Sequence, residues 1–233
     1  MTPDEADFWF LPLGGTGEIG MNLNLYGHNG RWLMVDCGLT FEAKTDVDGE
    51  PIADSRAEIQ MADPGFIADR KDCLDGLIIT HAHEDHIGAV PYLWQRFQCP
   101  VYTTAYSAEI LRRKLKEADL LDKVPVKVVE AGSELDIGVF SVKWIQLTHS
   151  IPEPFALLIS TPAGRVFHTA DWKLDSAPVV GEPYQPEDFS ALADMQVDAM
   201  VCDSTNADIP GWSASEASLY RGIILSRRRA AWW

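Results

Sequence analysis

Residues Leu77 to Ala89 read LIITHAHEDHIGA, and this stretch decides how the rest of the chain is interpreted. The apolar run that ends at Thr80 predicts a short buried strand, and the apolar residues at helical spacing from Ile87 predict a helix. Between the two, three of the six histidines of the chain stand within six residues, interleaved with the carboxylate of Asp85. Histidines and a carboxylate between a strand and a helix predict a metal site at this junction.

The spacing of the cluster divides its side chains between two ions. Alternate residues of an extended segment point the same way, so His81 and His83 can face one metal. Where the chain turns into the helix, Asp85 and His86 point elsewhere and can reach a second ion. Imidazole and carboxylate suit zinc and its neighbours. Two ions about 3.5–4 Å apart can stabilise both oxygens of a displacement and bring the pKa of bound water near neutrality.

Two residues outside the cluster are candidates to extend these coordination shells. His149 and Asp171 each stand just past a predicted strand, where ligand loops belong, and the two oxygens of a carboxylate can bridge two ions. The alternatives are a turn histidine at His149 and an ordinary loop or helix-capping aspartate at Asp171. We expect His28 to be exposed in a hairpin turn, and His168 to be a packed histidine or one that orients a ligand.

The glycines near the N-terminus imitate a dinucleotide-binding fingerprint. Gly15, Gly17 and Gly20 follow a predicted strand, and Asp36 stands at the end of a later one. The third glycine of that fingerprint opens a helix, whereas residues Met21 to Tyr26 alternate as a half-buried strand. The glycines are therefore expected to form a tight turn close to the metal site.

The bulk composition is that of a globular chain with one large or two small domains. The 233 residues carry 35 Asp+Glu against 19 Lys+Arg, a formal net charge of -16. This charge argues against binding nucleic acid through a simple basic patch, but bound cations can dominate the field at a site, so a nucleic-acid substrate remains open. The acidic start without a signal peptide, and the lack of a long apolar run, predict a cytoplasmic protein without membrane contact. Four scattered cysteines are interpreted as buried, reduced thiols.

Many short apolar segments alternate with a few helical ones, and this order predicts sheets sandwiched between helices. The motifs resemble the metallo-β-lactamase superfamily, and within it the ribonuclease J family of the β-CASP group. The resemblance runs in family order over residues 8 to about 216. It rests on Leu11–Asn22 (LPLGGTGEIGMN), Val35–Gly38 (VDCG), Thr80–Ala89 (THAHEDHIGA), Thr148–Ser150 (THS), Phe167–Lys173 (FHTADWK) and Cys202–Ala207 (CDSTNA). It implies the α/β (α+β) class, as an αββα sandwich of two mixed sheets flanked by helices.

The resemblance also implies roles for single residues. His81, His83 and His149 would bind one zinc, and Asp85 and His86 the other, with Asp171 bridging both; Mn²⁺ or Mg²⁺ are alternatives to zinc. Asp36 would orient the histidine loop. Hydroxide between the ions would attack phosphorus in line, because the family hydrolyses RNA phosphodiesters from a 5′ monophosphate end and internally. The resemblance also raises the expectation of a homo-oligomer for the full-length relative.

The match stops before the chain does. The family inserts a β-CASP domain and then completes the lactamase fold with one more histidine ligand, whereas this chain ends SRRRAAWW and has no histidine beyond His168. We therefore expect a metallo-β-lactamase domain at residues 1–216, incomplete at its C-terminal end. Residues 217–233 are expected to form an atypical tail, and the chain to be a truncated or frame-shifted product with reduced or no activity. Two alternatives remain: a stand-alone hydrolase of a thioester, a lactone or another small substrate, and a non-catalytic interaction module or relic.

Overall fold

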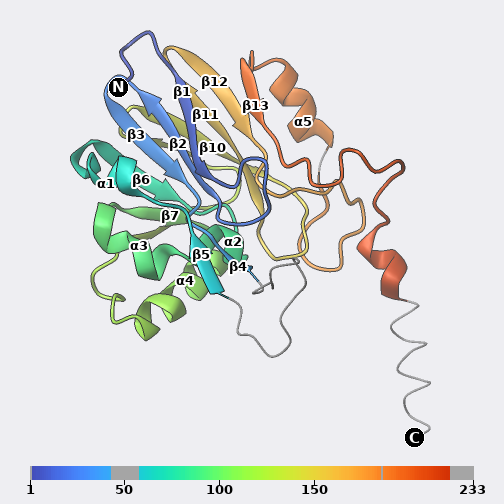
Figure 1. Cartoon of the computed structure of the whole chain (residues 1–233). Helices are drawn as coiled ribbons and strands as arrows, with labels where there is room; N and C mark the ends of the chain where they lie inside the picture. Colours follow the sequence, from blue (N-terminus) through green and yellow to red (C-terminus); the bar gives the residue numbers. More distant parts are fainter. Residues whose placement is uncertain (1, 43–57, 185, 221–233) are drawn as a thin grey trace, which may run out of the picture.

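Two β-sheets packed face to face, with helices on their outer faces, make up the described part of the chain (Figure 1). A computed structural model describes residues 2–42, 58–184 and 186–220. The first sheet has the order β1 (Trp9–Gly14), β2 (Leu23–His28), β3 (Arg31–Val35), β6 (Leu74–Ile78), β7 (Val101–Thr103), β8 (Val126–Val128). The second has the order β13 (Ala199–Val201), β12 (Gly164–His168), β11 (Phe155–Thr161), β10 (Phe140–Gln146), β9 (Glu134–Ile137). Both sheets combine parallel and antiparallel pairs, so the predicted mixed sandwich is confirmed.

The helices are distributed over the two outer faces and the ends of the strands. Figure 1 shows α1, α3 and α4 beside the first sheet and α5 beside the second. The helical segments are α1 (Gly65–Ala68), η1 (Lys71–Cys73), α2 (Glu84–Ile87), α3 (Val90–Phe97), α4 (Ala105–Glu117), α5 (Pro186–Ala193) and η2 (Glu216–Leu219). A separate pair of strands, β4 (Leu39–Glu42) and β5 (Glu58–Met61), lies near α2.

Three apolar clusters hold these layers together. The first packs α1, α3 and α4 on the outer face of the first sheet, with Leu77 and Leu111 among its members. The second fills the space between the sheets, where Tyr26 and Trp144 are fully buried. The third packs Phe189 of α5 against the second sheet. Burial of each such side chain stabilises the fold by about 1.5–3 kcal/mol. The packed sandwich in turn fixes the positions of the strand ends and of the loops that follow them.

Several local predictions need correction. Strand β2 is buried on both faces rather than half-buried, because Leu25 packs under the helices while Tyr26 packs between the sheets. The segment predicted as mostly loop between Leu39 and Arg70 contains β4 and β5 as well as the short helix α1; residues 43–57 of it lie outside the described residues. The single predicted helix after the histidines is two helices, α2 and α3.

The expected domain boundary coincides with a 3-10 helix near the end of the described chain. Helix η2 begins at Glu216, where the domain was predicted to end, and residues 221–233 lie outside the described part. The division into residues 1–216 and a tail of residues 217–233 therefore stays a prediction. In the part of the chain that is described, no helix combines the length and apolar character needed to cross a bilayer.

Candidate metal centre

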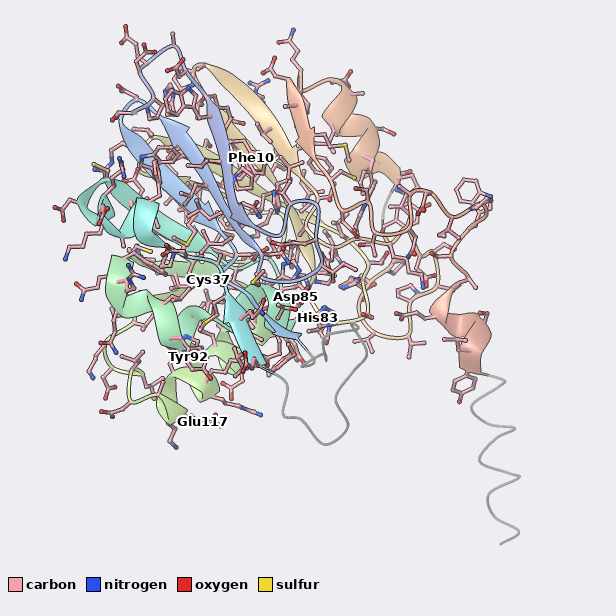
Figure 2. The ribbon with its side chains drawn as sticks, in the orientation of Figure 1. Phe10, Cys37, His83, Asp85, Tyr92 and Glu117 are labelled. Atoms are coloured by element: carbon pink, nitrogen blue, oxygen red, sulfur yellow. The ribbon has the colours of Figure 1, made fainter. Side chains whose placement is uncertain are left out.

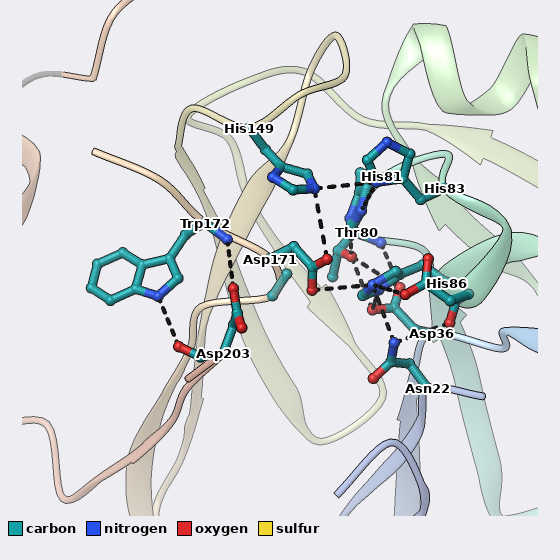
Figure 3. Close-up of polar contacts among 12 residues, drawn as sticks. Asn22, Asp36, Thr80, His81, His83, His86, His149, Asp171, Trp172 and Asp203 are labelled. Carbon is teal, nitrogen blue, oxygen red and sulfur yellow. Dashed lines mark hydrogen bonds and ion pairs between the residues drawn. The ribbon is translucent and has the colours of Figure 1, made fainter. Parts of the chain in front are cut away.

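The predicted ligands come together where loops from both sheets meet. His81 and His83 lie in the loop that follows β6 of the first sheet, and Asp85 and His86 lie in α2 directly after it. His149 comes from the loop between β10 and β11 of the second sheet. Asp171 follows β12 of that sheet. Figure 2 marks His83 and Asp85 at this end of the sandwich, and Figure 3 shows the side chains converging. All six residues predicted as metal ligands are thus brought together.

Three histidines form the first group. His81 Nε2 lies 3.1 Å from His83 Nδ1, and His149 Nε2 lies 3.2 Å from the same nitrogen. Asp171 Oδ2 is 3.6 Å from His149 Nε2, which makes a set of four donors that could hold one ion. Burial lowers the pKa of all three imidazoles, and of His81 well below its ordinary value, so they are neutral at pH 7. Neutral imidazole is the form that binds a metal.

A second group shares Asp171 with the first. His86 Nε2 lies 3.2 Å from Asp171 Oδ1 and 3.5 Å from Asp85 Oδ2. These three residues could hold another ion. Burial opposes ionisation of Asp171, but the hydrogen bond from His86 and the nearby histidines outweigh it and lower the pKa of this carboxyl. Because its two oxygens face different groups, Asp171 lies as a bridging carboxylate would.

Asp36 joins the backbone of the histidine loop to the second group. This carboxylate is 1% exposed, and its Oδ1 accepts a hydrogen bond of 2.8 Å from the Thr80 backbone N–H. His86 Nδ1 lies 2.7 Å from Asp36 Oδ2, which leaves His86 Nε2 directed at Asp171. Burial alone would lower the pKa of His86, but the charges of Asp36 and Asp171 raise it to about 10. Asp36 thus contacts both the Thr80 backbone and the His86 ring, which is consistent with the orienting role that the resemblance implied for it.

Sequence reasoning missed two residues that touch the centre. Asn22 Nδ2 lies 3.2 Å from His86 Nε2 and donates to the Asp85 carbonyl at 3.1 Å. Gly38 lies so close to α2 that a Cβ there would be 1.5 Å from the Asp85 carbonyl oxygen. The sequence indicated these two residues only through their neighbours: Asn22 comes shortly after the glycine turn, and Gly38 stands two residues after Asp36.

A cleft of about 720 Å³ opens beside the second group. The glycine turn predicted at residues 15–20 lines one side of it, followed by strand β2 rather than a helix. Asp203 and Cys202, at the end of β13, line the other side. Cys202 is exposed and Cys73 is half-buried, so the prediction that all four thiols are buried is wrong; Cys37 and Cys99 are buried as predicted. Strand β13 is three residues long and leaves Cys202 at the rim of the cleft.

The two remaining histidines lie outside both groups. His28 is 3% exposed, not exposed as predicted, because residues 3–7 fold over the hairpin and the Asp7 carbonyl lies 2.7 Å from His28 Nδ1. His168 is packed between the sheets, with Nδ1 2.8 Å from the Tyr26 hydroxyl. Burial lowers the pKa of His168 to about 4.

The donor set fits divalent metal ions. Neutral imidazoles and ionised carboxylates are ligands for borderline divalent cations. Ring nitrogens of three histidines lie 3.1–3.2 Å apart, and the pKa of each imidazole is lowered. Neutral rings cannot all donate hydrogen bonds to one another. The arrangement is the one expected around a cation. The carboxylates of Asp85 and Asp171 supply the negative charge that such a cation needs.

Comparison with known proteins agrees with the sequence resemblance. A family model described as the metallo-beta-lactamase superfamily matches residues 20–194. Ribonuclease J of Sinorhizobium meliloti is 41% identical over 96% of this chain and 39% of the relative, and ribonuclease J of Corynebacterium glutamicum is 41% identical over 89% and 28%, respectively. The chain thus spans well under half the length of these relatives. A solved protein of unknown function from Enterococcus faecalis V583 superposes with a TM-score of 0.61 at 16% identity, over 96% of this chain and 58% of that one, which reflects a shared fold.

Proposed function

The chain belongs to the metallo-beta-lactamase superfamily, and from this premise we propose that it is the metal-binding part of a hydrolase that cleaves RNA phosphodiesters. The observation that carries the proposal is the position of Asp171, with one oxygen at the three-histidine group and the other at the Asp85–His86 group. The substrate class rests on the relatives named ribonuclease J, of which the chain covers a part. Together with this substrate, we propose a cytoplasmic location for the protein.

We assign His81, His83 and His149 to one ion and Asp85 and His86 to the other, with Asp171 shared. Zinc is the expected metal, with Mn²⁺ or Mg²⁺ as alternatives. When bound, two such ions supply hydroxide near neutral pH and electrostatic stabilisation of a phosphoryl group.

The residues of the chain prepare this chemistry. Asp36 holds His86 in the tautomer that leaves Nε2 free to ligate, because Nδ1–H donates to the carboxylate. Asn22 fixes the Asp85 carbonyl and borders the cleft. We infer that an extended strand of substrate enters through this cleft, which the glycine turn lines. Its acidic lining requires bound cations before a phosphate can approach.

The test is cleavage of a 5′-monophosphorylated RNA by the purified chain, with and without added Zn²⁺ or Mn²⁺. We expect a metal-dependent product, formed at a reduced rate, that His83→Ala abolishes and that His28→Gln, a change at a histidine outside the site, retains. Melting curves of both variants control for folding. A metal-loaded chain that turns over a thioester or lactone and leaves RNA intact would contradict the assigned substrate.

We also propose that residues 1–216 form the metal-binding unit and that residues 217–233 are a separate tail. Limited proteolysis that removes the tail should leave metal affinity unchanged. A loss of bound metal on removing the tail would contradict this division.

A further inference from the structure

We propose that Glu153 is a positioning residue that holds His149 against His81 and His83 by capping helix α4. This inference rests on the proposed metal site, since it concerns the residue that places one of the assigned ligands. Glu153 is not one of the proposed metal ligands, and it lies outside the motifs that carry the family resemblance.

The first metal group has to be assembled across the sandwich. His81 and His83 belong to the first sheet, through the loop after β6, whereas His149 belongs to the second, through the loop between β10 and β11. A donor set of this kind needs ligand atoms placed to within about 0.5 Å. Contacts that cross from the His149 loop to the first sheet and its helices therefore decide the geometry.

Glu153 makes such a contact. The backbone N–H of Tyr106, in the first turn of α4, donates to Glu153 Oε2 at 2.8 Å across 47 residues of sequence. Helix α4 packs on the first sheet through Leu111 and Leu115, while Glu153 lies near the end of the loop that carries His149. The base of the loop is closed by the Leu147 N–H, which donates to the Pro154 carbonyl at 3.2 Å.

The residue at the N-cap position of α4 does not cap the helix with its side chain, so Glu153 can do so. Thr104 stands at the N-cap position, yet its side chain accepts no hydrogen bond from the helix, and its Oγ1 is buried without a partner among the described residues. Helices leave N–H groups unpaired in the first turn, and a carboxylate there also meets the positive end of the helix dipole. Glu153 therefore gains a favourable contact only when its loop lies against α4.

Helix α4 carries this restraint on to the metal-binding helix. Lys114, near the far end of α4, forms an ion pair with Glu84, the residue before Asp85 in α2. On the other side of His149, the Lys173 N–H donates to the Thr148 carbonyl at 2.8 Å, which ties the loop to the segment that follows Asp171. The His149 loop is thus held at Thr148 to the segment that follows β12, and at Glu153 to a helix that packs on the first sheet.

Titration of the full 233-residue chain with Co²⁺, followed by calorimetry and by visible absorption, tests this role. We expect Glu153→Ala to weaken binding of the first ion about tenfold and to change its absorption band, as removal of groups that orient a ligand does. Glu153→Gln keeps an acceptor oxygen and should restore most of the affinity. Glu109→Ala removes an exposed glutamate that pairs with Arg113 on the same helix, and should leave binding unchanged.

A second variant removes the donor instead of the acceptor. Tyr106→Pro deletes the N–H that Glu153 accepts from, at a first-turn position where proline is tolerated, and Tyr106→Ala is its control. The proline variant should weaken binding as Glu153→Ala does, and the two losses should not add. Unchanged first-ion affinity in Glu153→Ala, or fully additive losses, would overturn the positioning role alone. A parent chain that binds no Co²⁺ would overturn the proposed metal site itself.

Discussion

Replacement of Asp36 by asparagine isolates the contribution of one buried charge to the metal centre. Asparagine has the size of aspartate and tolerates the left-handed backbone of this residue, where φ is 63°. It can keep an oxygen for the Thr80 N–H, which donates to Oδ1 at 2.8 Å. The other position becomes an amide NH₂, which cannot accept from His86 Nδ1–H, 2.7 Å away in the parent.

The expected losses follow from that single contact. A hydrogen bond to a charged group contributes about 1.5–3 kcal/mol, which corresponds to a fall in melting temperature of roughly 3–12 °C for a chain of this size. In the neutral form of His86, which is the form that binds a metal, the one remaining hydrogen would then lie on Nε2, the nitrogen that faces Asp171, instead of on Nδ1. We therefore expect metal affinity at the Asp85–His86 group to fall about 10–100-fold.

Calorimetric metal titration and melting curves in chelator measure the two effects separately. Asp75→Asn is the matched control, because Asp75 is a half-buried carboxylate near the start of β6, paired with Arg31 rather than with a site residue. It should lower the melting temperature and leave metal affinity intact. An Asp36→Asn chain that binds both ions as tightly as the parent would refute this account of Asp36.

Four further predictions concern the same centre. The pKa of His86 in the metal-free chain is raised to about 10, so its proton must leave before a metal binds: affinity at this group should rise about tenfold per pH unit between pH 7 and 9, with one proton released per ion in calorimetry performed in several buffers. Because the pKa of His86 is higher in the folded chain than in the unfolded one, its protonation stabilises the metal-free fold fully below pH 6.5, and this stabilisation is lost as pH rises through 10. Melting curves recorded with a chelator over this pH range would show the loss, and a melting temperature independent of pH would contradict it. Gly38→Ala, whose Cβ would lie 1.5 Å from the Asp85 carbonyl oxygen, should displace α2 and abolish binding at the Asp85–His86 group, and retention of two bound ions would contradict this packing. Chelation should lower the melting temperature by about 5–10 °C relative to the chain at 100 times the dissociation constant, a shift that a protein without a metal site would not show.

Local patterns predicted the parts of the fold and site that depend on near neighbours in sequence. Apolar runs, alternation and helical spacing located the strand before the histidine cluster, the strand after the glycine turn and the helical stretch from Ile87. Residue type located the six candidate ligands. Contacts between distant segments were out of reach. Asn22 meets His86 across 64 residues and Tyr106 meets Glu153 across 47, and no spacing rule connects such pairs.

The mistaken predictions have the same origin. His28 stands beside an Asn-Gly turn and was expected to be exposed, but residues 3–7 cover it. Strand β9 carries no apolar pattern that a sequence could show, because three of its four residues are exposed and only Ile137 is buried. Cys202 follows an apolar run, yet its short strand leaves the thiol at the cleft. Tertiary packing decided each case.

Metal content is the most direct test of the proposed two-ion centre. The purified chain would be saturated with Zn²⁺, freed of loosely held metal by gel filtration, and analysed by elemental mass spectrometry beside His83→Ala. We predict two ions per parent chain and at most one in the variant, with both proteins folded. A folded parent chain that retains no ion, or a variant that retains as many as the parent, would contradict the assignment of His81, His83, Asp85, His86, His149 and Asp171 as the ligands.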